Sequence, residues 1–231
     1  MKTNHLLEVV DLSVIFPSRR GAGAVRAVDQ VSFSVPKGST VGLVGESGSG
    51  KTTIGRTLLR LQRATAGQVF YNGREILTMS EAEFKPLRRQ MQMIFQDPAE
   101  SLNPRHTVRD ILEEPFIVQK MGTKDERRKW VLDLLDKVGL PASAMDRFPY
   151  EFSGGQRQRI GIARALALNP RVVVCDEPVS ALDVSIQAQV INLLMDLQRA
   201  HRLSYLFIAH DLAVVEHISH QIAVMYLGRI V

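Results

Sequence analysis

Residues 45–53, which read GESGSGKTT, constrain the fold of this chain more than any other segment. Residues 45–52 fill the P-loop pattern G-x-x-x-x-G-K-[ST] without a gap. The apolar, β-branched run at residues 40–44 predicts a buried strand before the loop, and the apolar spacing within residues 51–61 predicts a helix after it. This order predicts the strand–loop–helix unit of an α/β protein.

The residue types in this loop suit phosphate groups. Glycines allow backbone N–H groups to close around phosphate oxygens, at a helix N-terminus that favours anions. The Lys51 ammonium can reach the β- and γ-phosphates of a nucleotide, and the Thr52 hydroxyl can ligate Mg²⁺. The loop residues expected to contact a nucleotide are Gly45, Glu46, Ser47, Gly48, Ser49, Gly50, Lys51, Thr52 and Thr53. The alternative interpretation is a glycine-rich turn that matches the pattern by chance. The pattern also does not specify the reaction, because kinases, GTPases, helicases and transport ATPases all share it.

Composition bounds the class of protein. The 231 residues suffice for one large domain or two small ones, and 45% of them are apolar, as in a protein with a full core. No stretch approaches the roughly 18 apolar residues of a membrane span, and the N-terminus lacks the apolar region of a secretory signal. Cys175 is the only cysteine, which excludes an internal disulfide, fits a reducing cytoplasm and favours a small buried side chain. The net charge of +5 is mild and no basic patch is clustered, so nucleic acid is not expected as a partner.

Strand-like and helical segments alternate along most of the chain. Residues 6–16 and 26–35 alternate apolar and polar side chains and predict an antiparallel ribbon around a loop at 17–23. Helical patterns replace strands between residues 97 and 152, and strands and helices alternate again afterwards, which predicts a parallel sheet. The other predicted elements are a hairpin of 67–71 and 74–77 with an Asn72-Gly73 turn, strands at 91–95, 171–175, 204–208 and 221–225, and helices at 125–140, 156–168, 184–200 and 212–218.

Four positions outside the loop suit nucleotide chemistry once a P-loop is present. Asp176 and Glu177 end an apolar strand, where one carboxylate suits Mg²⁺ and the second can activate or orient an attacking water; the alternative is a pair of solvated acids. Gln96 can ligate Mg²⁺ and sense the γ-phosphate, or it is only a polar residue leaving a strand. His210 can contact the γ-phosphate, although a lone histidine is more often a surface or core residue.

Residues 152–157, which read FSGGQR, precede an apolar helix and form a second helix start that can receive an anion. One domain rarely needs two such sites for one nucleotide. The segment is therefore either a structural turn or a receiver of phosphate from another molecule. Arg157, Arg159 and Arg164 follow on the same predicted helix and are expected to solvate or brace it.

Together these segments resemble the ATP-binding-cassette (ABC) family over essentially all 231 residues. The similar motifs are residues 45–52 (Walker A), Gln96 (Q-loop), Ser153-Gly154-Gly155-Gln156 (signature, with Phe152 where leucine is commoner), Asp176 and Glu177 (Walker B and the catalytic glutamate), residues 180–183 (D-loop) and His210 (switch histidine). Residues 95–104, 152–159 and 181–189 look like the ATPase subunits of oligopeptide, dipeptide, glutathione and nickel importers.

The resemblance implies one nucleotide-binding domain over residues 1–231, with ATP and Mg²⁺ as cofactors. It implies an α/β, RecA-like P-loop core with an antiparallel β-subdomain over 1–96 and 156–231, and an α-helical insert over 97–155 that ends in the signature motif. The roles it assigns are catalysis to Lys51, Glu177 and His210; Mg²⁺ binding to Thr52, Gln96 and Asp176; adenine stacking to Phe16, where tyrosine is common; and contact with a partner's ATP to Ser153, Gly155 and Gln156.

The resemblance also implies partners and a location. Two homologous ATPase subunits, identical or different, would sandwich two ATP molecules head to tail, and permease subunits would ride on their motion. A solute-binding protein would act indirectly, and the complex would sit at the cytoplasmic face of the inner (plasma) membrane. The family usually continues beyond the position of Val231, so a C-terminal segment is expected to be missing. The competing functions are a non-transport cassette ATPase acting on nucleic acid or the ribosome, and a small-molecule kinase.

Overall fold

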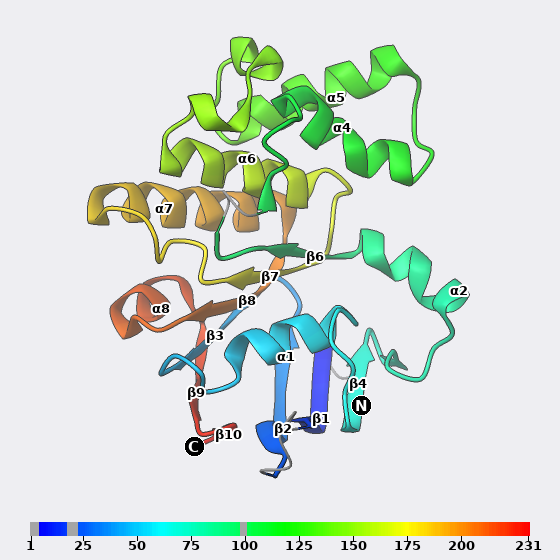
Figure 1. The fold of residues 1–231 in the computed structure, drawn as a ribbon, viewed down its shortest axis with the longest axis vertical. Coiled ribbons are helices and arrows are strands. Elements are labelled where there is room, and N and C mark those ends of the chain that lie inside the picture. The colour runs from blue at the N-terminus through cyan, green and yellow to red at the C-terminus, as the bar shows by residue number, and fades with distance from the viewer. Residues whose placement is uncertain (1–4, 18–22, 98–100) are drawn as a thin grey trace.

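A central sheet with two apolar cores, one on each face, organises the molecule (Figure 1). The computed structural model describes residues 5–17, 23–97 and 101–231. The five parallel strands of the central sheet are β3 (Thr40–Gly45), β6 (Met91–Ile94), β7 (Val172–Asp176), β8 (Ser204–Ala209) and β9 (Gln221–Tyr226), and β10 (Arg229–Ile230) pairs antiparallel with β9. Their order across the sheet is β10-β9-β3-β8-β7-β6. The predicted parallel sheet is therefore confirmed, and β10 is an addition.

The alternation of side chains along β7 shows why both faces are covered. Val173 and Cys175 are buried in the core beneath helices, whereas Val172 and Val174 are buried in the core on the opposite face. Strands buried on both sides read as continuous apolar runs, because neither face can be polar. Burial also raises the pKa of the Cys175 thiol, so this cysteine is the inert core residue that the sequence predicts.

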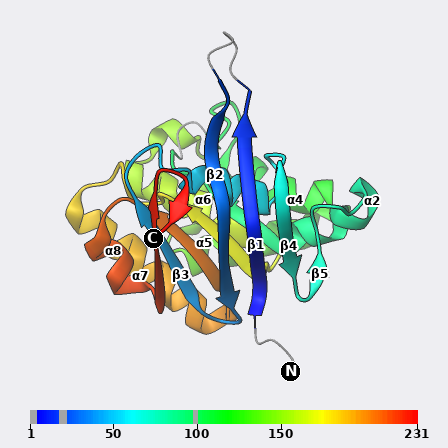
Figure 2. The same ribbon diagram turned by 90° about the horizontal axis from the view of Figure 1, so that it is seen from below.

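A second, antiparallel sheet packs below the first, with helix α1 (Lys51–Leu58) between them (Figures 1 and 2). Its strands are β1 (His5–Phe16), β2 (Val25–Pro36), β4 (Ala66–Tyr71) and β5 (Arg74–Glu75), in the order β2-β1-β4-β5. This confirms the predicted ribbon and hairpin. Asn72 and Gly73 have φ of 49° and 76°, as a two-residue hairpin turn of type I′ requires. Most of the loop predicted at 17–23 lies outside the described residues.

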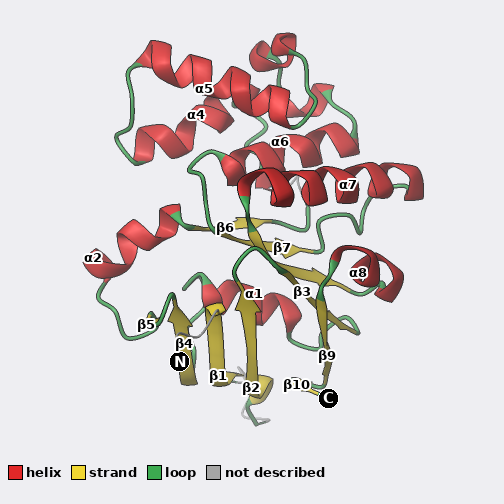
Figure 3. Cartoon of the chain, turned by 180° about the vertical axis from the view of Figure 1, so that it is seen from behind, coloured by secondary structure: helices red, strands yellow, loops and turns green. Residues whose placement is uncertain are grey.

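Helices cover the opposite face of the central sheet and extend beyond its β6 edge (Figures 1 and 3). The helices on this face are α4 (Val108–Val118), α5 (Lys124–Lys137), α6 (Gly154–Leu166), α7 (Val184–His201) and α8 (Leu212–Ile218), with 3₁₀ turns at Ala142–Asp146 and Pro149–Glu151. Helix α2 (Glu81–Phe84) and the 3₁₀ turn Lys85–Arg89 pack on the other face, in the core shared with the antiparallel sheet. Within the residues that the structure describes, none of these helices is long and apolar enough to cross a bilayer.

Four predicted helix boundaries differ from the observed ones by two residues or more, and one of them is the end of α6, at Leu166 rather than at residue 168. Helix α1 ends at Leu58 rather than at residue 61, because Arg60 has a left-handed φ of 56° and Leu61 turns out to solvent, 60% exposed. Helix α5 ends at Lys137 rather than at residue 140, before Gly139 at a φ of 68°. Helix α6 starts at Gly154 rather than at residue 156, because the Ser153 side chain caps it.

Candidate functional site

The glycine-rich loop joins the end of β3 to the start of α1 and has the backbone that its sequence requires. Gly48 and Gly50 have φ of 80° and 104°, values that residues other than glycine rarely adopt. A Cβ on Gly50 would lie 2.0 Å from the Ala27 carbonyl oxygen, so the loop also has no room for one. A Cβ on Gly45 would meet the Met225 carbonyl oxygen at 2.2 Å. The glycines therefore allow the loop to pack directly against β2 and β9.

A cavity of about 440 Å³ lies over this loop and brings most of the predicted site together. Its lining residues are Ala27, Ser47, Gly48, Gly50, Lys51, Thr52, Thr53, Gln96, Glu177 and His210. Sequence reasoning missed only Ala27, a small apolar residue of β2 that carries no chemical signal. Gln96, Glu177 and His210 reach the cavity because each lies at or just beyond the carboxyl end of a parallel strand.

The Lys51 ammonium is buried within the loop that it is predicted to serve. Its Nζ donates to the carbonyl oxygens of Gly45 at 2.7 Å and Glu46 at 2.8 Å. Burial lowers the pKa of Lys51, and the nearby carboxylates of Glu177 and Asp176 oppose that shift. The side chain thus lines the cavity while its Nζ bonds to two loop carbonyl oxygens.

Thr52 and Asp176 form the candidate metal-binding pair. The Thr52 hydroxyl donates to Asp176 Oδ1 at 2.8 Å. Burial raises the pKa of Asp176, and the hydrogen bond from Thr52 opposes this shift. A hydroxyl beside a buried carboxylate is a donor set that suits Mg²⁺, because this cation prefers oxygen ligands and keeps several waters. No cluster of three or more His, Cys, Asp or Glu side chains suited to a metal occurs within residues 5–17, 23–97 and 101–231.

Glu177 is held between two other predicted site residues. Its Oε2 accepts a hydrogen bond from Gln96 Nε2 at 3.2 Å and lies 3.2 Å from His210 Nδ1. Glu177 has a left-handed φ of 44°, and its N–H donates to the Ile208 carbonyl oxygen at 2.9 Å, which anchors the residue to β8. A strained backbone conformation at a non-glycine residue is typical of functional sites. The arrangement presents a carboxylate, an amide and an imidazole to one space.

The segment from Ser153 to Gln156 does not line this cavity. Ser153 Oγ accepts from the Gln156 N–H at 3.3 Å, and Gln156 Oε1 accepts from the Ser153 N–H at 3.0 Å, so the two side chains form a capping box for α6. A Cβ on Gly155 would lie 2.5 Å from Ile186 Cγ2, so this glycine allows α6 and α7 to pack closely. The segment has the contacts of a structural turn within one chain, and the predicted role toward a partner's phosphate stays a prediction.

Four other predicted nucleotide contacts also lie outside the cavity lining. Gly45, the last residue of β3, is one of them, and its carbonyl oxygen accepts a hydrogen bond from Lys51. Glu46 is exposed, and its carbonyl rather than its side chain faces Lys51. Ser49 is buried, and its Oγ has no hydrogen-bond partner among the described residues. Phe16 ends β1 with 37% of its surface exposed. An exposed ring at a strand end can stack on a base, and this role also stays a prediction.

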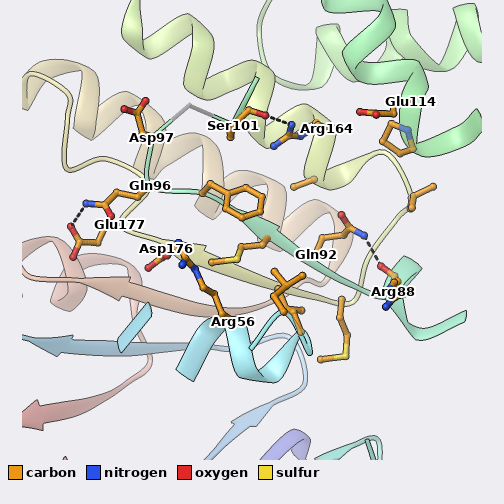
Figure 4. Close-up of a pocket in the computed structure, with 18 of the residues that line it drawn as sticks. Arg56, Arg88, Gln92, Gln96, Asp97, Ser101, Glu114, Arg164, Asp176 and Glu177 are labelled. Carbon is orange, nitrogen blue, oxygen red and sulfur yellow. Dashed lines mark hydrogen bonds between the residues drawn. The ribbon is translucent and has the colours of Figure 1, made fainter. Parts of the chain in front are cut away.

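A larger cavity of about 1130 Å³ adjoins the first and shares Gln96, Glu177 and His210 with it (Figure 4). Its wall includes Arg56 of α1, Phe95 after β6, Glu114 of α4 and Arg164 of α6, so it lies between the central sheet with α1 and the helices α4 and α6. The sequence does not predict this larger cavity, because the residues that line it come from separate segments of the chain.

The three arginines of α6 brace this helix, as predicted. Arg157 donates to the Phe152 carbonyl oxygen at 3.0 Å, and Arg159 to that of Val138 at 2.7 Å. Arg164 lines the larger cavity and donates to the Ser101 carbonyl oxygen at 2.6 Å (Figure 4). Helix α6 is thus tied to the segment that follows Gln96.

Comparison with known proteins identifies what the chain is similar to. Residues 28–180 match the model of the "ABC transporter" family. The oligopeptide transport ATP-binding protein AppF of Bacillus subtilis is 56% identical over 230 residues, which cover 97% of this chain and 70% of that protein. The glutathione import ATP-binding protein GsiA of Salmonella choleraesuis is 54% identical over 231 residues, 98% of this chain and 37% of that protein. The dimeric structure of the ATP-binding cassette MJ0796 in a post-hydrolysis state, bound to ADP and Pi, matches with a TM-score of 0.87 at 28% identity, covering 97% of this chain and 96% of that one.

Proposed function

This chain belongs to the ABC transporter family, and on that premise we propose that it is the ATP-hydrolysing subunit of a membrane importer. The solute is a peptide or a related small molecule such as a dipeptide, an oligopeptide, glutathione or nickel. The observation that carries the proposal is the single cavity in which Lys51, Gln96, Glu177 and His210 meet. The 54–56% identity to peptide and glutathione import proteins supports the importer class.

ATP binds with its phosphates over the glycine-rich loop. Loop N–H groups and the N-terminus of α1 attract the anion, and the Lys51 ammonium exchanges its carbonyl partners at Gly45 and Glu46 for phosphate oxygens. Thr52, Asp176 and Gln96 would hold Mg²⁺, which when bound neutralises phosphate charge. Phe16 stacks on the adenine ring.

Hydrolysis transfers the γ-phosphoryl group to water. Glu177 orients the attacking water and accepts its proton at Oε2, the oxygen to which Gln96 and His210 already point. His210 holds the water and the γ-phosphate in line. The O–P bond to the β-phosphate breaks as the bond from water to phosphorus forms, and the products are ADP and inorganic phosphate. Positioning and charge stabilisation supply most of the catalysis in this chemistry.

A second ATPase subunit completes the site. The cavity holds the P-loop, the Q-loop glutamine and the histidine of one chain, while the helix start at Ser153 stands apart from it. In a head-to-tail dimer Ser153, Gly155 and Gln156 close on the partner's γ-phosphate, and its loss on hydrolysis loosens the dimer. The dimeric state of the similar cassette MJ0796 supports this arrangement. The closing and loosening of the dimer change the conformation of the permease subunits to which it is bound. The protein therefore works at the cytoplasmic face of the plasma membrane.

Reconstitution tests the proposal. The chain would be co-expressed with permease subunits and a solute-binding protein of the same importer class, and ATP-driven uptake of a labelled peptide into vesicles would be measured. Peptide uptake and the hydrolysis of ATP to ADP and inorganic phosphate should both require this chain. Both should be lost in Lys51→Ala. Transfer of the γ-phosphoryl group to a small acceptor instead of water would contradict the proposal and identify a kinase.

A further inference from the structure

The turn between β9 and β10 contacts the glycine-rich loop through its backbone. The Gly228 N–H donates to the Ser49 carbonyl oxygen at 3.1 Å. In a trans peptide the C=O of one residue and the N–H of the next point in opposite directions. The Ser49 carbonyl is therefore held toward the turn, and the Gly50 N–H is directed away from it. Gly50 lines the nucleotide cavity, so this peptide plane determines whether its N–H is available to a phosphate.

Asp29 of β2 holds this turn by both its backbone and its side chain. Its N–H donates to the Gly228 carbonyl oxygen at 2.8 Å. Its Oδ2 accepts two hydrogen bonds from the Arg229 guanidinium, one from Nε at 2.8 Å and one from a terminal nitrogen at 2.7 Å, and both are charge-assisted. The hydrogen bonds from Arg229 hold the pKa of Asp29 below its usual value, so this carboxylate is charged at neutral pH. Arg26 adds a separate bond to Oδ1 at 3.1 Å.

The space around this contact leaves little freedom for an alternative arrangement. Figures 1 and 2 show β10 beside β2. Asp29 and Arg229, which join the two strands, are 200 residues apart in the sequence. The space for a Cβ on Gly50 is occupied by the Ala27 carbonyl oxygen at 2.0 Å and by Met225 Cε at 3.2 Å. The glycine-rich loop therefore packs backbone against backbone with β2 and with the β9–β10 turn. If the turn moved, the loop could not move with it, and the hydrogen bond from the Gly228 N–H to the Ser49 carbonyl oxygen would be lost.

We propose that Asp29 and Arg229 are positioning residues for phosphate binding. By holding the turn at Gly228, they fix the Ser49–Gly50 peptide plane and keep the Gly50 N–H directed into the nucleotide cavity. The inference rests on nucleotide binding at the glycine-rich loop, and it adds two residues that touch neither nucleotide nor metal.

The test measures ATP affinity of the full chain without hydrolysis, in the absence of Mg²⁺. Arg229→Met and Asp29→Asn should each raise the Kd for ATP by roughly tenfold, the effect of losing about one well-oriented hydrogen bond to a charged group. The double variant should be no weaker than either single one, because both changes break the same contact. The exchanged pair Asp29→Arg with Arg229→Asp should recover part of the affinity. Arg26→Met is the matched control, because it removes an Asp29 partner that is not in the turn, and its Kd should match the wild type.

Amide NMR separates positioning from a general loss of stability. In nucleotide-free wild-type protein the Gly228 amide should exchange slowly with solvent, and in Arg229→Met the Gly50 amide resonance should shift. A purely structural role would lower the melting temperature and leave the Kd of the folded protein unchanged, which would overturn the inference. A rapidly exchanging Gly228 amide in the wild type would overturn it even if no variant folds. Absence of ATP binding by the wild type would instead contradict the proposed function.

Discussion

The Thr52 hydroxyl donates a hydrogen bond to the Asp176 carboxylate at 2.8 Å, although 124 residues separate the two in the chain. The bond joins the first turn of α1 to the end of β7, so the P-loop and the acidic strand end share one space. Both residues are predicted Mg²⁺ ligands. The bond also offsets part of the cost of burying Asp176, whose pKa is raised by burial.

The pair leads to a first prediction, on metal dependence. Thr52→Val removes the hydroxyl at nearly constant volume, so the Mg²⁺ concentration for half-maximal ATP hydrolysis should rise by roughly tenfold. Thr52→Ser keeps the oxygen and should stay close to the wild type. Steady-state hydrolysis in a Mg²⁺ titration measures both. Equal Mg²⁺ dependence in the valine and serine variants would remove Thr52 from the metal site.

A second prediction concerns Glu177. Glu177→Gln keeps the shape of the side chain but cannot accept a proton from water, so hydrolysis should fall by about a hundredfold or more while ATP binding persists. Phosphate release and the Kd for ATP are the two measurements. Glu114→Gln is the control, since Glu114 lines only the larger neighbouring cavity. Unchanged hydrolysis in Glu177→Gln would contradict the assigned role.

A third prediction concerns Lys51. Lys51→Ala removes the ammonium that now bonds to the Gly45 and Glu46 carbonyl oxygens, so the Kd for ATP should rise by at least about tenfold. Adenosine, which lacks phosphates, should bind the variant and the wild type equally. Equilibrium binding of a fluorescent ATP analogue provides the measurement, with Lys37→Ala, an exposed lysine outside the cavity lining, as control. Equal ATP affinity in Lys51→Ala and the wild type would contradict the P-loop assignment.

Local patterns predicted most of the fold because strands buried on both faces have few alternatives. The sequence predicts helix α8 at its observed bounds, Leu212–Ile218, and the five parallel strands of the central sheet within about two residues. The sheet order could not be predicted, since it depends on contacts between distant segments. The end of α1 was missed because the left-handed Arg60 breaks a helix that the apolar Leu59 and Leu61 appeared to continue.

The candidate site likewise has a part that the sequence predicts and a part that it does not. Gln96, Glu177 and His210 could be predicted because a polar residue after an apolar strand stands out in the sequence. Their bonds at Glu177 Oε2 could not, since those depend on the spacing of neighbouring strands. The contact of Gly228 with Ser49 is also invisible in the sequence, because both partners are backbone groups that any residue carries.

A fourth prediction uses the cap of helix α4. The Thr107 side chain accepts a hydrogen bond from the Asp110 N–H, and the Thr107 hydroxyl and backbone N–H both donate to the Asp110 carboxylate. The two bonds donated to the carboxylate lower the pKa of Asp110. An acid whose folded pKa lies below its unfolded value stabilises the fold above the unfolded pKa, near 3.9, and this contribution is lost as pH falls through the folded pKa. Thr107→Ala should therefore lower the free energy of unfolding by about 1 kcal/mol at pH 6 and by less at pH 3.5.

Urea unfolding at the two pH values measures the difference. Ser185→Ala, at an exposed position in the first turn of α7, is the control and should change stability little at either pH. A Thr107→Ala deficit that grows on acidification would show that the Asp110 carboxylate does not gain from the cap.

A fifth prediction tests whether two subunits share one ATP. Ser153 lies outside the cavity that holds Lys51 and Glu177, so a large side chain there should leave ATP binding by the monomer intact. In the Glu177→Gln background, where ATP persists, the chain should form a dimer when ATP is added, and Ser153→Arg should abolish it because the large side chain leaves no room for the shared phosphate. Ser153→Ala loses the α6 cap, at a cost of about 1 kcal/mol, and the hydroxyl that faces the partner's phosphate, but it adds no bulk, so it should still form a dimer, more weakly than the parent. Size-exclusion chromatography with light scattering reads the dimer, and loss of monomer ATP binding in Ser153→Arg would place Ser153 in its own chain's site rather than in the partner's.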